Sequence, residues 1–180
     1  MDGAATYTSI NYHHRETLMR AKSKADTRWS EFVGDVYPVR IMLFIGSRKE
    51  MVESIGDAFA KYKGTESKET RKEFVENIRS QFGSQESTLA GECGSVVASN
   101  GLKLWIVRLA KFDRSVGSMV ILSHECLHAA LSVLDFCGVS ENPPFEGLCY
   151  THEAIFKTFL LCAMSHIGGL EKQTAKQSAR

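Results

Sequence analysis

The chain has no excess of charge of one sign. Its 180 residues include 22 basic and 21 acidic side chains, which gives a net charge of +1 at neutral pH. Proteins that bind nucleic acids or acidic membrane surfaces usually present a field of positive charge. We therefore expect neither a nucleic acid nor a membrane among its partners. Hydrophobic residues at 43% and charged residues at 24% are ordinary for a soluble globular protein.

The sequence also lacks the features of secreted and membrane-spanning proteins. Its five cysteines form no C-x-x-C pair, and their odd number argues against a disulfide framework. Residues 1–16 contain no apolar segment like that of a signal peptide. No apolar run approaches the roughly 18 residues that a transmembrane helix needs. These absences predict reduced thiols and a cytoplasmic location.

No internal repeat and no long linker divides the chain. Its length suits one domain with a sizeable core. Residues 1–16 are polar and rich in small side chains, so we expect a loose segment there. Residues 17–169 are expected to form a single domain, and the polar residues 170–180 are expected to form a disordered tail.

The apolar pattern of the first half predicts helices around one buried strand. Residues 39–45 are almost continuously apolar, which predicts a central strand covered on both faces. Apolar side chains of residues 17–33 fall near one face of a helix, although their spacing is uneven, and a helix is expected there. Two further helices are expected at 48–61 and 68–82, where apolar residues recur at helical spacing.

The second half is expected to begin with a β-hairpin. Asn100-Gly101 separates two apolar runs, at 95–98 and 102–109. Asn-Gly between apolar runs is a strong hairpin signal, because a type I′ turn needs positive φ at both central residues. The sequence therefore predicts two antiparallel strands joined by a type I′ turn.

Two helices are expected after the hairpin. The first should begin at a cap formed by Asp113 or Ser115 and end at about Phe136. The second should open at Pro143-Pro144, since proline is tolerated in the first helical turn, and end at Gly168-Gly169. These elements together predict an α+β fold, in which a small mixed or antiparallel sheet with a hairpin packs on several helices.

The first of these two helices carries the pattern His124-Glu125-x-x-His128. Residues four apart on a helix lie one above the other on the same face. Both histidines can therefore direct a ring nitrogen at one zinc ion. Glu125 lies about 100° further round the helix, where its carboxylate can reach a metal-bound water without binding the metal. The spacing predicts a catalytic zinc site with Glu125 as the general base.

A catalytic zinc site normally has a third protein ligand. The metzincin arrangement is excluded, because Leu131 and Leu134 occupy the positions of its glycine and third histidine. Glu146 is favoured, since it lies in the first turn of the next helix and a short loop can bring the two helices face to face. His152 is an alternative about 240° further round that helix, so the two cannot face one metal. Asp135, one residue beyond the position of the third histidine of the metzincins, is a weaker alternative.

Tyr150 follows Glu146 by four residues and shares its helix face. A phenol there can donate a hydrogen bond to the substrate oxyanion or to Glu146. The alternative is a half-buried tyrosine that only packs its ring. Tyr150 is therefore a candidate catalytic residue beside Glu125.

The segments HECLHAALSVLDFCGV and FEGLCY give the chain a family resemblance over residues 102–161. A hairpin, an H-E-x-x-H helix, a glycine turn and a helix with glutamate near its start are similar to the zincin metallopeptidases of the gluzincin type. The sequence most resembles small zincin-like proteins of phages and prophages. The resemblance implies a minimal zincin-like domain, with His124, His128 and Glu146 as Zn²⁺ ligands and Glu125 as the base.

The expected function is a zinc-dependent metallopeptidase that hydrolyses peptide bonds in a peptide or protein substrate. An extended substrate would pair with a strand edge, for which residues 102–109 are the candidate. The alternative is a catalytically silent zinc-binding protein of the phage type that binds a host factor. A phage-encoded protein of either kind would act in the host cytoplasm. Tyr150 stands where thermolysin-like enzymes have an aspartate, so their specificity is not implied.

Overall fold

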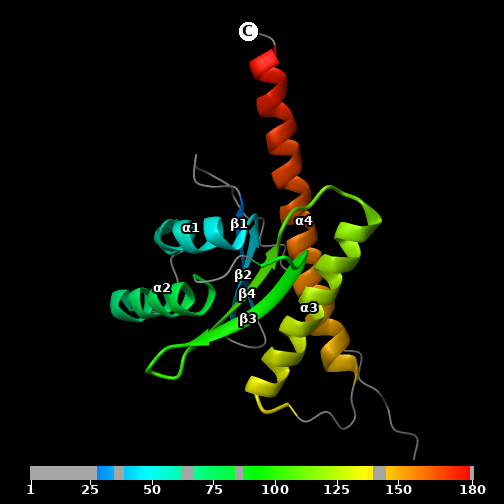
Figure 1. Ribbon diagram of the computed structural model, residues 1–180. Coiled ribbons are helices and arrows are strands. Elements are labelled where there is room, and N and C mark those ends of the chain that lie inside the picture. The colour runs from blue at the N-terminus through cyan, green and yellow to red at the C-terminus, as the bar shows by residue number, and fades with distance from the viewer. Residues whose placement is uncertain (1–27, 35–38, 62–66, 84–86, 140–144, 179–180) are drawn as a thin grey trace, which may run out of the picture.

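The computed structural model describes residues 28–34, 39–61, 67–83, 87–139 and 145–178. Within these ranges the fold is α+β, with four helices and one four-stranded mixed sheet (Figure 1). The predicted fold class is confirmed at this level. The expectations for residues 1–16 and most of the helix expected at 17–33 lie outside the described residues.

The sheet has the strand order β1-β2-β4-β3. Strands β1 (Trp29–Val33) and β2 (Arg40–Ile45) are antiparallel, β2 and β4 (Lys103–Leu109) are parallel, and β4 and β3 (Gly91–Val97) are antiparallel. All of β2 is buried, which confirms the central strand predicted there. Among the described residues β3 forms one edge of the sheet, and its outer side has no strand partner.

Helices cover both faces of the sheet (Figure 1). Helices α1 (Arg48–Lys61) and α2 (Lys68–Phe82) lie on one face, and their bounds match the predictions. Helices α3 (Val116–Phe136) and α4 (Phe145–Ser178) lie on the other face, packed against each other. The cleft described below lies between α3 and the edge strand β3.

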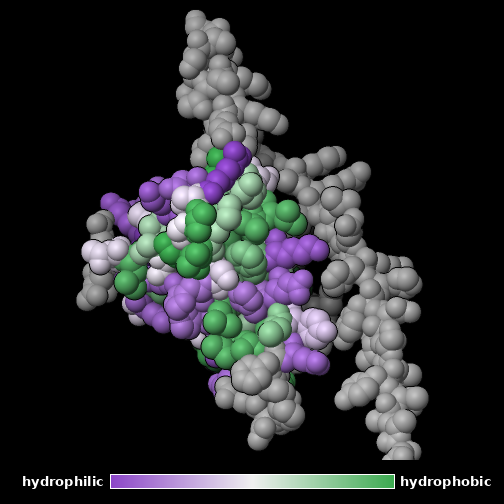
Figure 2. Space-filling model, turned by 90° about the vertical axis from the view of Figure 1, so that its right-hand side faces the viewer, coloured by the Kyte–Doolittle hydropathy of each residue, from purple (hydrophilic) through white to green (hydrophobic). Residues whose placement is uncertain are grey.

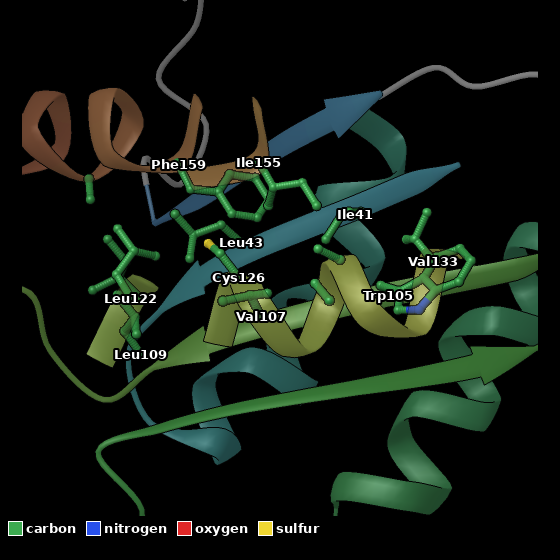
Figure 3. Packing of buried hydrophobic residues seen from close by; sticks show 14 of the residues in the cluster. Ile41, Leu43, Trp105, Val107, Leu109, Leu122, Cys126, Val133, Ile155 and Phe159 are labelled. Atoms are coloured by element: carbon green, nitrogen blue, oxygen red, sulfur yellow. The ribbon is translucent and has the colours of Figure 1, made fainter. Parts of the chain in front are cut away.

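Alternating residues of the central strands supply two cores. Ile41 and Leu43 of β2 join Trp105 and Val107 of β4 in the core beneath α3 and α4 (Figure 3). Met42, on the opposite face of β2, packs in the second core with α1 and α2. Consecutive strand residues point to opposite faces of the sheet. When helices cover both faces, the odd-numbered and the even-numbered residues of a strand must therefore both be apolar. The continuous apolar run of β2 meets that need.

Helix α3 begins and ends at residues expected from the sequence. The Oγ atom of Ser115 accepts a hydrogen bond from the main-chain N–H of Ser118, which satisfies one free donor of the first turn. Gly138 ends the segment in the left-handed region, with a φ of 68°, where glycine is favoured. Of the two predicted caps, Ser115 is the one observed. Asp113 accepts a hydrogen bond from the N–H of Ser115.

Helix α3 also passes a length and composition test for a membrane-spanning helix. Core helices of soluble proteins pass the same test, and α3 packs Leu122, Cys126 and Val133 into the core beneath the sheet. The surface on the side of α3 and α4 carries hydrophobic side chains in separate groups among hydrophilic ones (Figure 2). The composition of α3 is therefore weak support for a membrane location.

Three local predictions were wrong. Trp29–Val33 is a strand rather than the end of a helix, because it pairs along its whole length with β2. The hairpin turn is not type I′, since Gly101 has a φ of 83° but Asn100 does not have positive φ. Ala98 accepts from Gly101 and donates to Leu102, which is the pattern of a three-residue loop closed by a left-handed glycine.

The third wrong prediction concerns the end of α4. The helix was expected to stop at Gly168-Gly169, with a disordered tail behind it, yet it continues to Ser178 (Figure 1). Glycine costs about 1 kcal/mol relative to alanine inside a helix but does not break it. The residues that follow include glutamate, lysine, glutamine and alanine, which are good helix formers.

Candidate active site

The two histidines of the H-E-x-x-H pattern converge on one point. His124 and His128 lie one turn apart on α3, and both side chains are exposed. Their Nε2 atoms are 3.0 Å apart, and their rings are perpendicular, with centroids 4.5 Å apart. This arrangement follows from the four-residue spacing, which places both side chains on one helix face.

A cleft of about 570 Å³ lies beside the histidines, between α3 and β3. One wall is helical and the other is the β3–β4 hairpin together with the residue Leu89 that precedes it. The lining residues are Leu89, Gly91, Glu92, Cys93, Gly94, Ser95, Trp105, His124, Glu125, His128 and Ser132. The cleft therefore joins the H-E-x-x-H pattern to the free edge of the sheet.

Gly91 lets the edge strand approach the helix closely. A Cβ atom at Gly91 would lie 2.5 Å from Cγ2 of Ile121 and 2.9 Å from Cγ of Glu125. Real Cβ atoms essentially never come so near to other heavy atoms. The absence of a side chain at this position is thus what allows Glu125 to lie against β3.

We expect the substitution Gly91→Ala to destabilise the protein by about 1–3 kcal/mol, because the added methyl group must push α3 and β3 apart. Urea unfolding measures this change. The matched control is Gly147→Ala in α4, where a Cβ would meet nothing within 4 Å and helix propensity predicts a gain of up to about 1 kcal/mol. Equal stability of the two variants would contradict the close approach at Gly91.

Glu125 is the buried carboxylate of the cleft. The residue is only 7% exposed, and its carboxylate accepts no hydrogen bond from any described residue. Burial raises the pKa of Glu125 above its ordinary value, while the nearby His124 and His128 act in the opposite sense. A carboxylate that is desolvated and not hydrogen-bonded is a stronger base than one in water.

Cys93 forms a neutral part of the cleft wall. Burial and the charge of Glu125 raise the pKa of the Cys93 thiol to about 12. A thiol with so high a pKa is protonated at neutral pH and is a poor nucleophile. All five cysteines are free in the structure. The Cys93 thiol is therefore a poor candidate for a nucleophile in this cleft.

A largely buried ion-pair network connects β3 of the cleft wall to β4 and α1. Arg108 of β4 is 1% exposed and pairs with Glu92, its direct cross-strand neighbour on β3. The same guanidinium donates to the main-chain oxygens of Gly46 and Leu89, each at 3.0 Å. Arg48 of α1 also pairs with Glu92. The network thus ties the edge strand, the approach to it at Leu89 and the end of β2 together.

This network and the hairpin residues of the cleft were not predicted from the sequence. Arg108 carries the one signal that could have been used, since it is a charged residue inside an otherwise apolar strand. Its partner Glu92 lies 16 positions earlier. Only the register of β3 and β4 shows that the two residues are neighbours.

The histidine pair fits two ligand positions of a zinc ion. Two zinc–nitrogen bonds of about 2.0–2.1 Å at a tetrahedral angle separate the nitrogens by roughly 3.3 Å, close to the 3.0 Å observed here. Among the described residues, however, no group of three or more histidine, cysteine, aspartate or glutamate side chains is placed to hold a metal. The structure thus brings together two of the three predicted ligands.

Glu146, the favoured third ligand, is not brought to the histidine pair. It is exposed at the start of α4 and does not line the cleft. The rotation of α4 explains this. His152 faces α3, where its Nε2 atom lies 3.1 Å from the main-chain oxygen and 3.2 Å from Oγ of Ser123. Six residues earlier on a helix is about 120° away from that direction, so Glu146 turns aside from α3.

The other candidates also lie away from the histidine pair. His152 contacts Ser123, on a different side of α3 from the cleft. Asp135 is exposed and does not line the cleft. Tyr150 is 67% exposed and does not line it either, so the structure does not place its hydroxyl where a substrate oxyanion could be reached. The exposure corrects the alternative of a half-buried ring, and the catalytic role of Tyr150 stays a prediction.

The strand edge that faces the cleft also differs from the prediction. Residues 102–109 were the candidate edge, but β4 pairs with β2 on one side and with β3 on the other. An interior strand has no free main-chain groups for a substrate. Strand β3, of which only residues 95–97 lie in the predicted apolar run, holds the edge position instead.

Comparison of the chain with protein-family models, with curated proteins and with solved structures finds no match. The features of the chain that bear on function are those of the cleft: converging histidines, a buried carboxylate and a strand edge that is free among the described residues.

Proposed function

We propose that the protein is a zinc-dependent hydrolase that cleaves peptide bonds, built on a zincin-like arrangement of helix and edge strand. The observation that carries the proposal is the convergence of His124 and His128, with 3.0 Å between their Nε2 atoms, beside the buried carboxylate of Glu125. All three side chains line one cleft. A metal-binding pair and a general base in one water-accessible cleft are the parts that such a reaction needs.

His124 and His128 would hold the metal through their Nε2 atoms. When bound, zinc supplies a Lewis acid that polarises a carbonyl oxygen and lowers the pKa of water. The exposed rings leave room for a substrate on the cleft side. Glu146 stays the proposed third ligand on the strength of the resemblance alone, since it lies outside the group in the structure.

Glu125 would act as the general base. Its Oε atoms accept a proton from the attacking water and later donate it to the nitrogen of the leaving amine. The raised pKa of Glu125 suits both the removal of a proton from water and its return to the amine. A group that must accept and then release a proton works best when its pKa is near the working pH. The lack of a hydrogen-bond donor to Glu125 among the described residues leaves its oxygens available for water.

The outer edge of β3 would hold an extended substrate. Main-chain groups on a free strand edge can pair with a peptide as if it were a further strand. The side chains of β3 that face α3 are small, at Gly91, Cys93 and Ser95, so the cleft has space for the side chains of the substrate. This edge replaces the one expected at residues 102–109.

Elemental analysis of the purified protein tests the proposal. We expect about one zinc ion per chain in the unaltered protein and loss of zinc in His124→Ala and His128→Ala. The matched control is His152→Ala, which removes a histidine outside the cleft and should retain the metal. A zinc-free native protein, or equal zinc content in all of these variants, would refute the metal site.

The same measurement on Glu146→Ala decides the third ligand. Loss of zinc would assign Glu146 as a ligand and would require α4 to rotate relative to its position here. Retention would mean that the two histidines hold the metal without it.

A zinc-binding protein without hydrolytic activity is the second candidate. The absence of a third metal ligand among the described residues favours it, because an incomplete site can bind metal without positioning it for catalysis. Zinc-loaded protein that leaves every member of a mixed peptide pool intact, as judged by mass spectrometry, would support this alternative over the hydrolase.

A further inference from the structure

One end of the cleft holds a cluster of hydrogen-bond donors that the proposed chemistry does not use. Ser132 and Trp105 line this end. The indole Nε1 of Trp105 donates to Oγ of Ser132 at 2.9 Å, and the Nζ atom of Lys103 donates to the same oxygen at 3.4 Å. The ammonium group also lies over the rings of Trp105 and Phe136, at 5.0 and 5.4 Å from their centroids.

The hydrogen bonds of this cluster leave donors without acceptors. A serine hydroxyl has two lone pairs and one hydrogen, and both lone pairs of Ser132 are engaged by Trp105 and Lys103. Its own hydrogen has no acceptor among the described residues. Lys103 is half-buried, and within the part of the chain that the structure describes it forms no ion pair with a carboxylate. The cluster therefore offers an ammonium group and a polarised hydroxyl to an anion.

The position of the cluster relates it to the histidines. Ser132 lies four residues after His128 on α3, which is one turn and about 6 Å along the helix axis. Lys103 does not itself line the cleft, but its Nζ atom lies 3.4 Å from Oγ of Ser132, which does. An extended peptide advances about 3.3–3.6 Å per residue. If one peptide bond of a ligand lies at the histidines, a group one or two residues further along that ligand can therefore reach Ser132.

We propose that Lys103 and Ser132 form a subsite that binds a carboxylate group of the ligand, one or two residues from the bond that lies at the histidines. A carboxylate accepts a charge-assisted hydrogen bond from the ammonium and a second bond from the hydroxyl, and it supplies the negative charge that Lys103 lacks. Trp105 fixes the Ser132 hydroxyl so that its hydrogen points away from the indole. The role of the subsite in substrate selection rests on the proposed hydrolase function, whereas the binding of a carboxylate does not.

Two kinds of group could supply the carboxylate. The free C-terminus of a peptide would make the subsite a recognition element for chain ends. An aspartate or glutamate side chain within a longer peptide would make it a recognition element for acidic sequences. The chemistry at Lys103 is the same, so peptides that carry only one of these groups distinguish the sources.

The tryptophan indole resonances in a ¹H–¹⁵N spectrum test the subsite without zinc or hydrolysis. The chain has two tryptophans. The indole of Trp105 donates to Ser132, whereas that of Trp29 donates to Ser54 in the other core and is an internal control. The probes are acetyl-trialanine with a free C-terminus, the same peptide as the amide, and acetyl-Ala-Glu-Ala-amide.

We expect a saturable shift of the Trp105 resonance with at least one carboxylate probe, and no shift with the neutral amide. A shift with the free C-terminus alone identifies chain ends, and a shift with the glutamate peptide alone identifies acidic side chains. Lys103→Met keeps the apolar stem over the rings and should weaken binding about tenfold or more. Lys111→Met, which alters an exposed lysine paired with Asp113, should leave it unchanged.

Equal shifts with the amide and the carboxylates, unchanged affinity in Lys103→Met, or no shift with any probe would each overturn the subsite. The unchanged Trp29 resonance shows that Lys103→Met is folded. Because the titration uses zinc-free protein, a failure of the proposed hydrolase function would leave its result intact. If both proposals hold, Lys103→Met should also lower kcat/KM for the carboxylate peptide relative to its amide.

Discussion

The substitution Glu125→Gln is expected to reduce peptide hydrolysis by about 10²–10⁴-fold while the protein keeps its fold and its zinc. Glutamine has almost the same shape as glutamate, so it fills the same buried space against Gly91. It cannot accept a proton at neutral pH, so the general base is lost. Turnover of a fluorogenic peptide, measured beside zinc content and thermal unfolding, separates loss of chemistry from loss of structure.

The control for this prediction is Glu153→Gln, which alters an exposed glutamate on α4 outside the cleft. It should retain full turnover. Wild-type turnover in Glu125→Gln would remove Glu125 from the mechanism, even if zinc were still bound by the histidines.

The second large effect concerns stability. Arg108→Met is expected to destabilise the protein by about 3–5 kcal/mol, because it removes the buried one of the two arginines that pair with Glu92 and leaves only Arg48 of that pair. It also deprives the main-chain oxygens of Gly46 and Leu89 of a donor. Urea unfolding followed by circular dichroism measures the change. The control Arg79→Met, at an exposed arginine of α2, should change stability by less than about 0.5 kcal/mol.

The same ion pair predicts a loss of stability in acid. Burial would raise the pKa of Glu92, but hydrogen bonds and charges from Arg48 and Arg108 outweigh it, so the pKa lies below its ordinary value of 4.5. A group whose pKa is lowered by folding stabilises the protein above the pKa of the unfolded state. That contribution is lost as the pH falls from about 4.5 through the lower pKa of the folded state. In Glu92→Gln, stability should vary less over this acidic range, and an unchanged profile would contradict the pairing.

Elements defined by local signals were predicted well. Helices α1 and α2 have the predicted bounds, and α3 ends where Phe136 precedes a glycine turn. In each case apolar spacing and turn residues lie within one segment of the chain. Strand β1 was not predicted, because its conformation depends on pairing with β2 rather than on its own apolar spacing. The turn type failed for a related reason, since two loop geometries fit the same Asn100-Gly101 pair.

The candidate site divides in the same way. The convergence of His124 and His128 follows from their spacing on one helix, and it could be predicted without knowing the rest of the fold. The position of Glu146 depends on how α4 is rotated against α3, which is set by contacts such as that between His152 and Ser123. The roles of Gly91 and Lys103 depend on the packing of the hairpin against α3. No pattern within a single segment contains that information.

The cleft is encoded by one continuous stretch of chain. Every lining residue falls within residues 89–132, because the hairpin of β3 and β4 is followed directly by α3. The histidines, the base, the strand edge and the proposed carboxylate subsite can therefore be inherited, duplicated or exchanged as a unit. Changes in β1, α1 or α2 would act on ligand choice only indirectly, through the angle between one hairpin and one helix, whereas Glu146, the proposed third metal ligand, lies outside this stretch on α4. A change of ligand could therefore arise from substitutions within the short segment 89–132.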